Sequence, residues 1–127
     1  MRKVIRTLSG PRPLGPYSQA IVAGGFVFVA GQGPINPANN EMELGDIRSE
    51  TRRTLENIRG ILEASGSSLR DVVRVGVFLA DLNDFAAMNE VYKKFFPIDP
   101  PARTTVGVQL PKIKIDCIAW ASNPRKA

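Results

Sequence analysis

The sequence of 127 residues contains no histidine. This absence excludes Ser-His-Asp and Cys-His nucleophilic catalysis, metal ions held by imidazole, and acid–base catalysis by histidine. Any chemistry that the chain performs must therefore depend on carboxylates, lysine, arginine, tyrosine, hydroxyl groups, one thiol or backbone groups.

Cysteine is almost absent as well. Cys117 is the only one, so the chain cannot form an internal disulfide and has no cysteine pair for a zinc site. This usage is typical of a reducing compartment. The basic residues 1–7 lack the apolar core of a secretory signal, and no run approaches the roughly 18 apolar residues of a membrane span. We expect a cytoplasmic protein that has no membrane partner.

The chain also lacks the phosphate-binding P-loop motif, the glycine fingerprint of dinucleotide-binding folds and the nucleophile elbow of hydrolases. Its 17 basic and 12 acidic residues give a net charge of +5. The cations are scattered, without the interleaved aromatic residues that nucleic-acid-binding segments carry. We interpret the charge as a solvated surface that would attract acidic metabolites equally well, and we do not expect a nucleic acid partner.

Two helices are predicted from apolar residues that recur with helical spacing. The first begins at the N-cap Asp46 and ends at Gly66, and the second begins at Asn83 or Asp84 and ends before Pro97. Each has one apolar stripe to bury. The stripes consist of Ile47, Thr51, Leu55, Ile58 and Leu62 in the first helix and of Phe85, Met88, Tyr92 and Phe95 in the second.

Six strands are predicted, and the glycine pair 24–25 joins two of them in a hairpin. The order of elements, β-β-β-α-β-α-β-β, predicts one α+β domain over residues 1–127, with a mixed single-layer sheet and both helices on one face. The strands are residues 3–5, 20–23, 26–30, 71–80, 103–109 and 113–121.

Strict alternation along residues 71–80 predicts which side chains share a face of the sheet. One face would consist of Val73, Val75, Val77 and Leu79, and the other of Val72, Arg74, Gly76 and Phe78. This second face is too apolar for exposure to water, so we expect self-association to cover it.

Three segments combine small or rigid residues with polar side chains. Residues 15–20 place Tyr17 after a rigid turn, residues 30–34 let backbone amides approach a ligand closely, and residues 100–106 introduce Arg103 at a strand start. An arginine is always charged and binds a carboxylate through two parallel hydrogen bonds. The residues alone leave open whether Arg103 binds a ligand or forms a surface salt bridge.

In their order and spacing, G-P-Y-S-Q-A, V-A-G-Q, T-R-R-T-L-E-N-I-R-G-I-L-E-A-S-G, V-F-L-A-D-L-N-D-F and P-A-R-T-T-V resemble the reactive intermediate deaminase (Rid, YjgF or L-PSP endoribonuclease-type) family. The resemblance covers essentially the whole chain. It implies a chorismate-mutase-like fold, a homotrimer with a β-barrel core, and ligand clefts between subunits. It also implies hydrolysis of enamines and imines of the 2-aminoacrylate and 2-iminobutanoate type to a 2-keto acid and ammonia, without metal or cofactor.

The resemblance also implies roles for particular residues. Arg103 matches the arginine that binds the substrate carboxylate. Tyr17 matches a tyrosine that lines the cleft, and Gly31 matches a glycine whose amide faces the ligand. Asn89 matches a helix asparagine near the cleft, and Thr105 occupies a position that is often cysteine in the deaminases.

Two departures from the family pattern bear on catalysis. Ala30 stands where many active members have serine, which removes one hydroxyl contact. Aligned with the pattern V-E-I-[DE]-A-I-A, residues 113–119 place Lys114 at the glutamate that orients the attacking water. A charged lysine cannot accept a proton, but Asp116 lies on the same strand face, and a bulge or register shift could bring it into the site.

Three functions remain open at this point. Deamination would use Arg103 together with Asp116 or Lys114. Non-catalytic binding of a small 2-keto acid or related carboxylate, as a sensor or sink, would agree with Lys114 and Ala30. RNA cleavage or translation inhibition is the least favoured, because the usual histidine acid–base pair is missing and the basic residues are dispersed.

Overall fold

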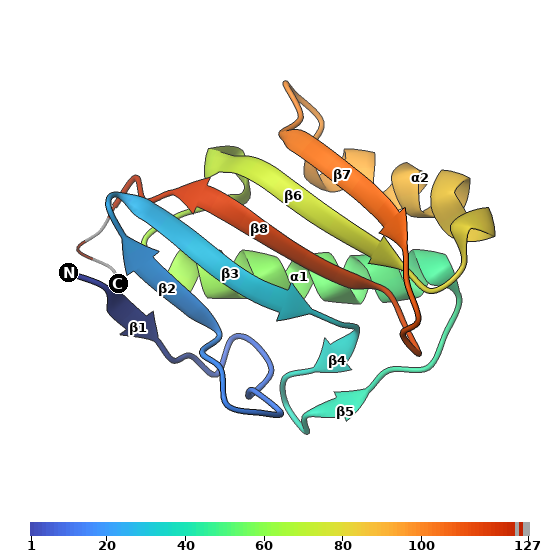
Figure 1. The fold of residues 1–127 in the computed structure, drawn as a ribbon, viewed down its shortest axis with the longest axis horizontal. Coiled ribbons are helices and arrows are strands. Elements are labelled where there is room, and N and C mark those ends of the chain that lie inside the picture. The colour runs from blue at the N-terminus through green and yellow to red at the C-terminus, as the bar shows by residue number, and fades with distance from the viewer. Residues whose placement is uncertain (124, 126–127) are drawn as a thin grey trace.

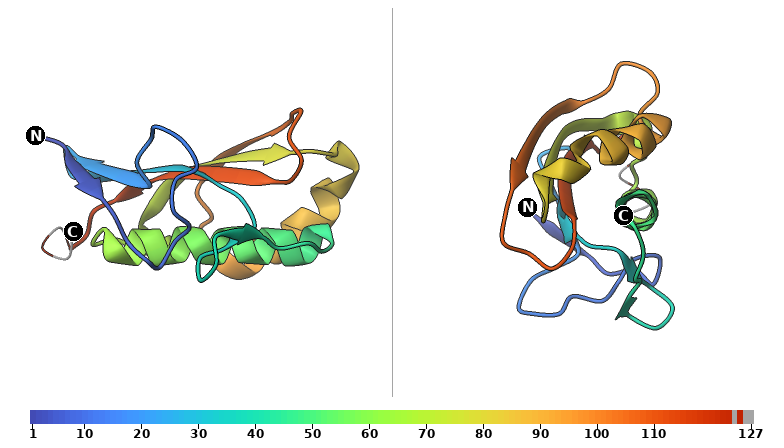
Figure 2. Two further views of the ribbon diagram at one scale, coloured as in Figure 1. Left: turned by 90° about the horizontal axis from the view of Figure 1, so that it is seen from below. Right: turned by 90° about the vertical axis from the view of Figure 1, so that its right-hand side faces the viewer.

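The computed structural model describes residues 1–123 and 125. Within this part of the chain, six strands form one sheet in the order β1-β2-β3-β8-β6-β7, in which β6 and β7 run parallel and the other neighbours antiparallel. Two helices cover one face of this sheet (Figures 1 and 2). The predicted α+β fold with both helices on one face is therefore confirmed.

The strands of the sheet match the predicted segments closely. Gly24 and Gly25 join β2 to β3 and have positive φ values of 59° and 82°, a backbone conformation that glycine adopts without steric cost. The strands are β1 (Lys3–Ile5), β2 (Ala20–Ala23), β3 (Phe26–Gln32), β6 (Val72–Leu79), β7 (Ala102–Gly107) and β8 (Lys114–Trp120).

The helices are α1 (Ile47–Ala64) and α2 (Phe85–Phe95). Asp46 caps α1, because its side chain accepts a hydrogen bond of 2.9 Å from the backbone amide of Ser49. Gly66, with a φ of 79°, follows the C-terminal end of α1. Neither helix, nor any other in the described residues, is long and apolar enough to cross a membrane.

Four short elements are missing from the sequence prediction. They are a separate hairpin of β4 (Ile35–Asn36) and β5 (Glu41–Met42) and the 3₁₀ helices η1 (Leu69–Asp71) and η2 (Leu82–Asp84). Each has only two or three residues, too few for a periodic pattern to reveal. Asp81 caps η2 by accepting from the amide of Asn83, so the chain turns once before α2 begins.

The structure corrects the predicted faces of Val72 and Val73. The pairing of β6 with β8 shifts register between residues 72 and 74, which is the signature of a β-bulge. As a result Val72 lies in the core at 8% exposure, whereas Val73 is 46% exposed. Beyond the bulge, Val75 and Val77 are buried as the alternation predicts.

The hydrophobic core lies between the sheet and the helices. The opposite side, which we call the open face, is covered by neither helix (Figure 2). It carries a shallow concavity with apolar and polar residues side by side. The side chains and glycine that we assign to the open face are Phe28, Arg74, Gly76, Phe78, Thr104, Val106, Asp116 and Ile118.

Candidate functional site

The predicted site residues form two separate groups in the chain. The arginine half-site consists of Asn89, Arg103 and Thr105, on α2 and β7. Strands β8 and β6 lie between β3 and β7, so the residues of β3 are about three strand spacings, or about 14 Å, from β7, and those of β8 about two spacings, or about 10 Å. The second group, which we call the glycine half-site, consists of Tyr17, Ala30, Gly31, Lys114 and Asp116, from the loop before β2, from β3 and from β8. Tyr17, Gly31 and Lys114 line one pocket, whereas Asp116 lines the concavity of the open face.

The arginine half-site holds its guanidinium against α2, on the helix side of the sheet. Nη1 of Arg103 donates a hydrogen bond of 2.7 Å to Oδ1 of Asn89. The guanidinium carbon lies 4.7 Å from the centre of the Tyr92 ring and 5.6 Å from that of Phe85. A cavity lined by Arg103, Asn89 and Tyr92 opens beside these groups. A ligand that enters this cavity would meet the guanidinium directly.

Arg103 forms no ion pair with a carboxylate among the described residues. Other cations do: Arg48 pairs with Glu90, and Lys112 pairs with Glu50. The surface salt bridge that the sequence left open for Arg103 is therefore not formed within the described chain. Its charge remains available for an anion that comes from outside.

Two residues near Arg103, Thr105 of β7 and Tyr92 of α2, carry hydroxyl groups. The hydroxyl groups of Thr105 and Tyr92 are buried and have no hydrogen-bond partner among the described residues. Burial raises the pKa of Tyr92 to about 12, although the positive charge of Arg103 opposes the shift. The phenol is therefore neutral at physiological pH.

The thiol of Cys117 should be unreactive in the folded protein. Burial, and then the negative charge of Asp116, raise its pKa to about 12, so the nucleophilic thiolate is scarce. We expect negligible labelling by an aromatic disulfide reagent at about pH 8 and labelling of the single thiol once guanidinium chloride unfolds the chain. Rapid labelling of the folded protein would contradict this environment.

The glycine half-site is built around an irregularity in β3. The pairing of β3 with β8 shifts register between Val29 and Gln32, so Ala30 and Gly31 depart from the regular ladder. A Cβ atom on Gly31 would lie only 2.8 Å from Cδ of Lys114. Glycine therefore leaves room for the lysine side chain to lie across the backbone at this point.

A pocket beside the glycine half-site is lined by Tyr17, Gly31 and Lys114. Arg12 also lines it, as does Lys112, whose charge Glu50 offsets, and no carboxylate of the described residues lines it. The Tyr17 hydroxyl accepts a hydrogen bond of 3.2 Å from the backbone amide of Leu14, which fixes the loop that carries the ring. The charge of the lining favours an anionic ligand.

Gln19, which sequence reasoning did not assign a role, holds the N-terminal loop in place. The buried side-chain amide donates to the carbonyl oxygens of Thr7, Gly10 and Pro11 and accepts from the amide of Thr7. These bonds fix the segment that leads into Tyr17. The only signal in the sequence is a glutamine at the boundary between a proline-rich loop and a strand.

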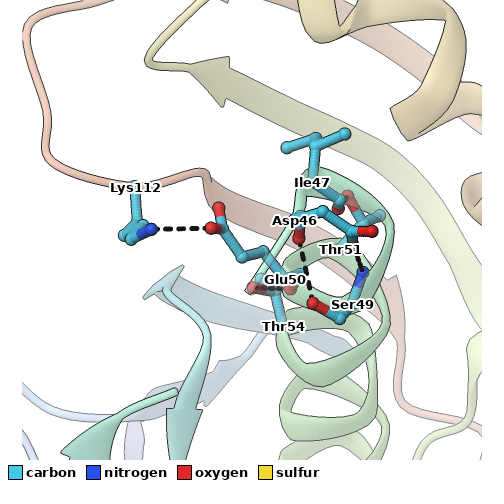
Figure 3. A network of polar contacts seen from close by, with 7 residues as sticks. All are labelled: Asp46, Ile47, Ser49, Glu50, Thr51, Thr54 and Lys112. Carbon is cyan, nitrogen blue, oxygen red and sulfur yellow. Dashed lines mark hydrogen bonds and ion pairs between the residues drawn. The ribbon is translucent and has the colours of Figure 1, made fainter. Parts of the chain in front are cut away.

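Glu50 is a second residue that the sequence did not reveal. It lies in the first turn of α1, is 7% exposed, and forms an ion pair of 2.8 Å with Lys112 (Figure 3). The helix dipole favours a carboxylate at this position. The pair ties the turn between β7 and β8, one wall of the pocket, to the start of α1.

Lys114 and Asp116 both lie on the side of β8 away from the helices. Asp116 faces Gly76 of β6, and a Cβ atom on that glycine would collide with Oδ1 of Asp116. Asp116 makes no hydrogen bond or ion pair with a described residue. Within one chain, these two candidates therefore lie on the opposite side of the sheet from the Arg103 guanidinium.

Comparisons with known proteins give similarity over the whole domain. The sequence profile of the family described as Endoribonuclease L-PSP matches residues 7–121. A RutC family protein of Pyrococcus horikoshii is 55% identical over 124 residues, which cover 94% of this chain and 98% of that protein. A 2-iminobutanoate/2-iminopropanoate deaminase of Dermatophagoides farinae is 46% identical over 112 residues, 87% of this chain and 88% of that protein. The crystal structure of Escherichia coli TdcF with bound serine has a TM-score of 0.87 and 41% identity, covering 93% of this chain and 98% of that one.

Proposed function

Since the chain belongs to the endoribonuclease L-PSP family, to which the reactive intermediate deaminases belong, we propose that it hydrolyses small 2-imino acids and their enamine forms to 2-keto acids and ammonia. The observation that carries the proposal is the set of contacts around the Arg103 guanidinium. Asn89 anchors this guanidinium, a cavity opens beside it, and no described carboxylate neutralises it. A 2-imino acid has a carboxylate next to its reactive carbon, so binding the carboxylate also places that carbon.

We propose that a second copy of the chain completes the site. The arginine half-site of one chain would face the glycine half-site of its neighbour, in a homotrimer whose central barrel is formed by the open faces. Two observations support this arrangement: the half-sites are far apart within one chain, and the open face carries Phe28, Phe78 and Ile118 without a helix to cover them.

The proposed reaction needs three protein contributions. Arg103 binds the carboxylate through charge-assisted hydrogen bonds, and the backbone at Gly31 borders the other side of the substrate. Asp116 orients a water molecule and takes its proton as the water oxygen attacks the C=N carbon. Asp116 passes this proton to the nitrogen, which gives a carbinolamine. Asp116 then takes the proton of the new hydroxyl group and delivers it to the amino group, so that the C=O bond forms as the C–N bond breaks and ammonia and the 2-keto acid leave.

We assign the carboxylate role to Asp116 rather than to Lys114. Asp116 is a base without an internal partner, whereas a charged lysine has no lone pair to accept a proton. Lys114 lies in the pocket lining, where its charge would attract the substrate anion. The absence of histidine from the sequence disfavours RNA cleavage, the activity in the family's description.

A coupled assay tests this proposal. A serine dehydratase supplies 2-aminoacrylate, and keto acid formation is followed with and without the protein. We expect acceleration by the wild type and a loss of about a hundredfold in kcat for Asp116→Asn. Lys114→Met should mainly raise KM.

The outcomes separate the candidate functions. A large kcat loss in Lys114→Met together with an active Asp116→Asn would reverse the assignment of roles. Calorimetric binding of 2-ketobutyrate by a wild type that gives no acceleration would select the sensor or sink function, for which Ala30 and Lys114 are the supporting departures from the family pattern.

A further inference from the structure

We propose that Tyr92 is a positioning residue: its ring, together with that of Phe85, holds the Arg103 guanidinium in the orientation that receives the ligand carboxylate. This inference rests on the proposed function of Arg103 as the carboxylate-binding group. It concerns residues of α2 that would act on the ligand only through the arginine.

Three side chains that contact the guanidinium lie on one face of α2. Phe85, Asn89 and Tyr92 follow one another at intervals of four and three residues, which aligns their side chains along the helix. All three contact the same guanidinium, one through a hydrogen bond and two through aromatic rings. A long and otherwise mobile arginine side chain is thus restrained from three positions.

Aromatic contacts restrain a cation without neutralising it. The electrostatic attraction to a ring face leaves the full positive charge available, whereas an ion pair with aspartate or glutamate would cancel it. Lys112 is held by such an ion pair, with Glu50 2.8 Å away. Arg103 is held by aromatic rings instead, so its charge stays available, as an anion-binding group requires.

The face of the Tyr92 ring makes the contact that the inference uses. The hydroxyl lies close enough to Arg103 for the guanidinium to oppose the burial that raises its pKa, but it forms no hydrogen bond of regular geometry with a described residue. The ring is fixed by packing on Phe96, 4.8 Å between centres. Tyr92 as a whole is 6% exposed, so the ring has little freedom to move. A phenylalanine at this position would keep every feature that the inference requires.

Substitutions at Tyr92 test the inference by calorimetric binding of 2-ketobutyrate and by KM and kcat in the coupled assay. Tyr92→Leu should weaken binding and raise KM by roughly three- to tenfold with a smaller change in kcat, as expected for loss of a cation–π contact. Tyr92→Phe should behave as the wild type. Phe85→Leu, at a ring that is 42% exposed, should weaken binding by roughly twofold.

The same helix offers a matched control. Phe95 stacks under Arg59 at 5.0 Å, and Phe95→Leu removes this second ring–guanidinium contact away from the half-site. This variant should bind 2-ketobutyrate as the wild type does. In an Arg103→Ala background, with residual binding measured at high ligand concentration, Tyr92→Leu should have no further effect.

Three outcomes would overturn the inference: wild-type binding by both Tyr92→Leu and Phe85→Leu, an equal loss in Tyr92→Phe and Tyr92→Leu, or an undiminished effect of Tyr92→Leu when Arg103 is absent. A different set of results is expected if the proposed function itself is wrong. If Arg103→Ala itself binds 2-ketobutyrate normally, the role of the arginine is wrong; if it does not bind but the ring variants do, only the positioning role is wrong.

Discussion

Replacing Arg103 by alanine should lower kcat/KM for 2-aminoacrylate hydrolysis by at least about a hundredfold, since two hydrogen bonds to a charged group contribute about 1.5–3 kcal/mol each. The loss should be this large because the carboxylate would enter a partly buried site without a cation to meet it. The coupled assay measures the effect on turnover, and calorimetry with 2-ketobutyrate measures it on binding.

Two further variants separate charge from geometry at this position. Arg103→Lys keeps the charge but loses the planar fork, so its kcat/KM should fall between those of the wild type and Arg103→Ala. Arg103→Ala should remain folded with a moderate loss of thermal stability, because it loses one hydrogen bond and two ring contacts but no ion pair with a described carboxylate. An Arg103→Ala protein with kcat/KM within about threefold of the wild type would contradict the role of the guanidinium.

Most of the fold could be predicted because its signals are local. The N-cap at Asp46, the glycine pair 24–25 and the apolar stripe of α1 each depend on residues that lie within a few positions of one another. The bulge at Val72 and Val73 has no such signal. It arises where β6 pairs with β8, more than 40 residues away along the chain, and local alternation cannot reveal it.

The supporting residues of the pocket were missed for the same reason. Glu50 and its partner Lys112 are separated by 62 positions, and Gln19 bonds to backbone groups as far as 12 residues away. In the sequence, each is a single polar residue, and the residues beside it give no sign of its partner. Only the folded chain brings the partners together and shows which wall of the pocket each of them fixes.

The division of the site depends on strand order, which the element pattern does not specify. Strand β8 lies between β3 and β6. The glycine half-site is therefore built on strands in the middle of the sheet, and the arginine half-site is built on β7, at one edge. Arg103 and Asp116 are close in sequence, yet Arg103 contacts α2 and Asp116 lies on the open face. Residue types alone predicted a site, but not that one chain holds two halves of it.

Two variants that are each inactive should regain activity when their chains assemble together into mixed trimers. Arg103→Ala carries an intact glycine half-site, and Asp116→Asn, or whichever half-site variant loses turnover, carries an intact arginine half-site. If each site takes one half from each of two neighbouring copies, random assembly of equal amounts gives about a quarter of the sites with both halves intact. Sedimentation of the wild type should first establish a trimer.

The decisive experiment is to unfold the two variants, refold them together, and measure the deaminase rate of the mixture. We predict about a quarter of the wild-type rate for the mixture. We predict no activity when the variants are refolded apart and then combined, or when Arg103→Ala is refolded with a variant that carries both Arg103→Ala and Asp116→Asn. A co-refolded trimer as inactive as its parents would mean that Arg103 and the carboxylate must belong to the same chain, and the two-copy site would be wrong.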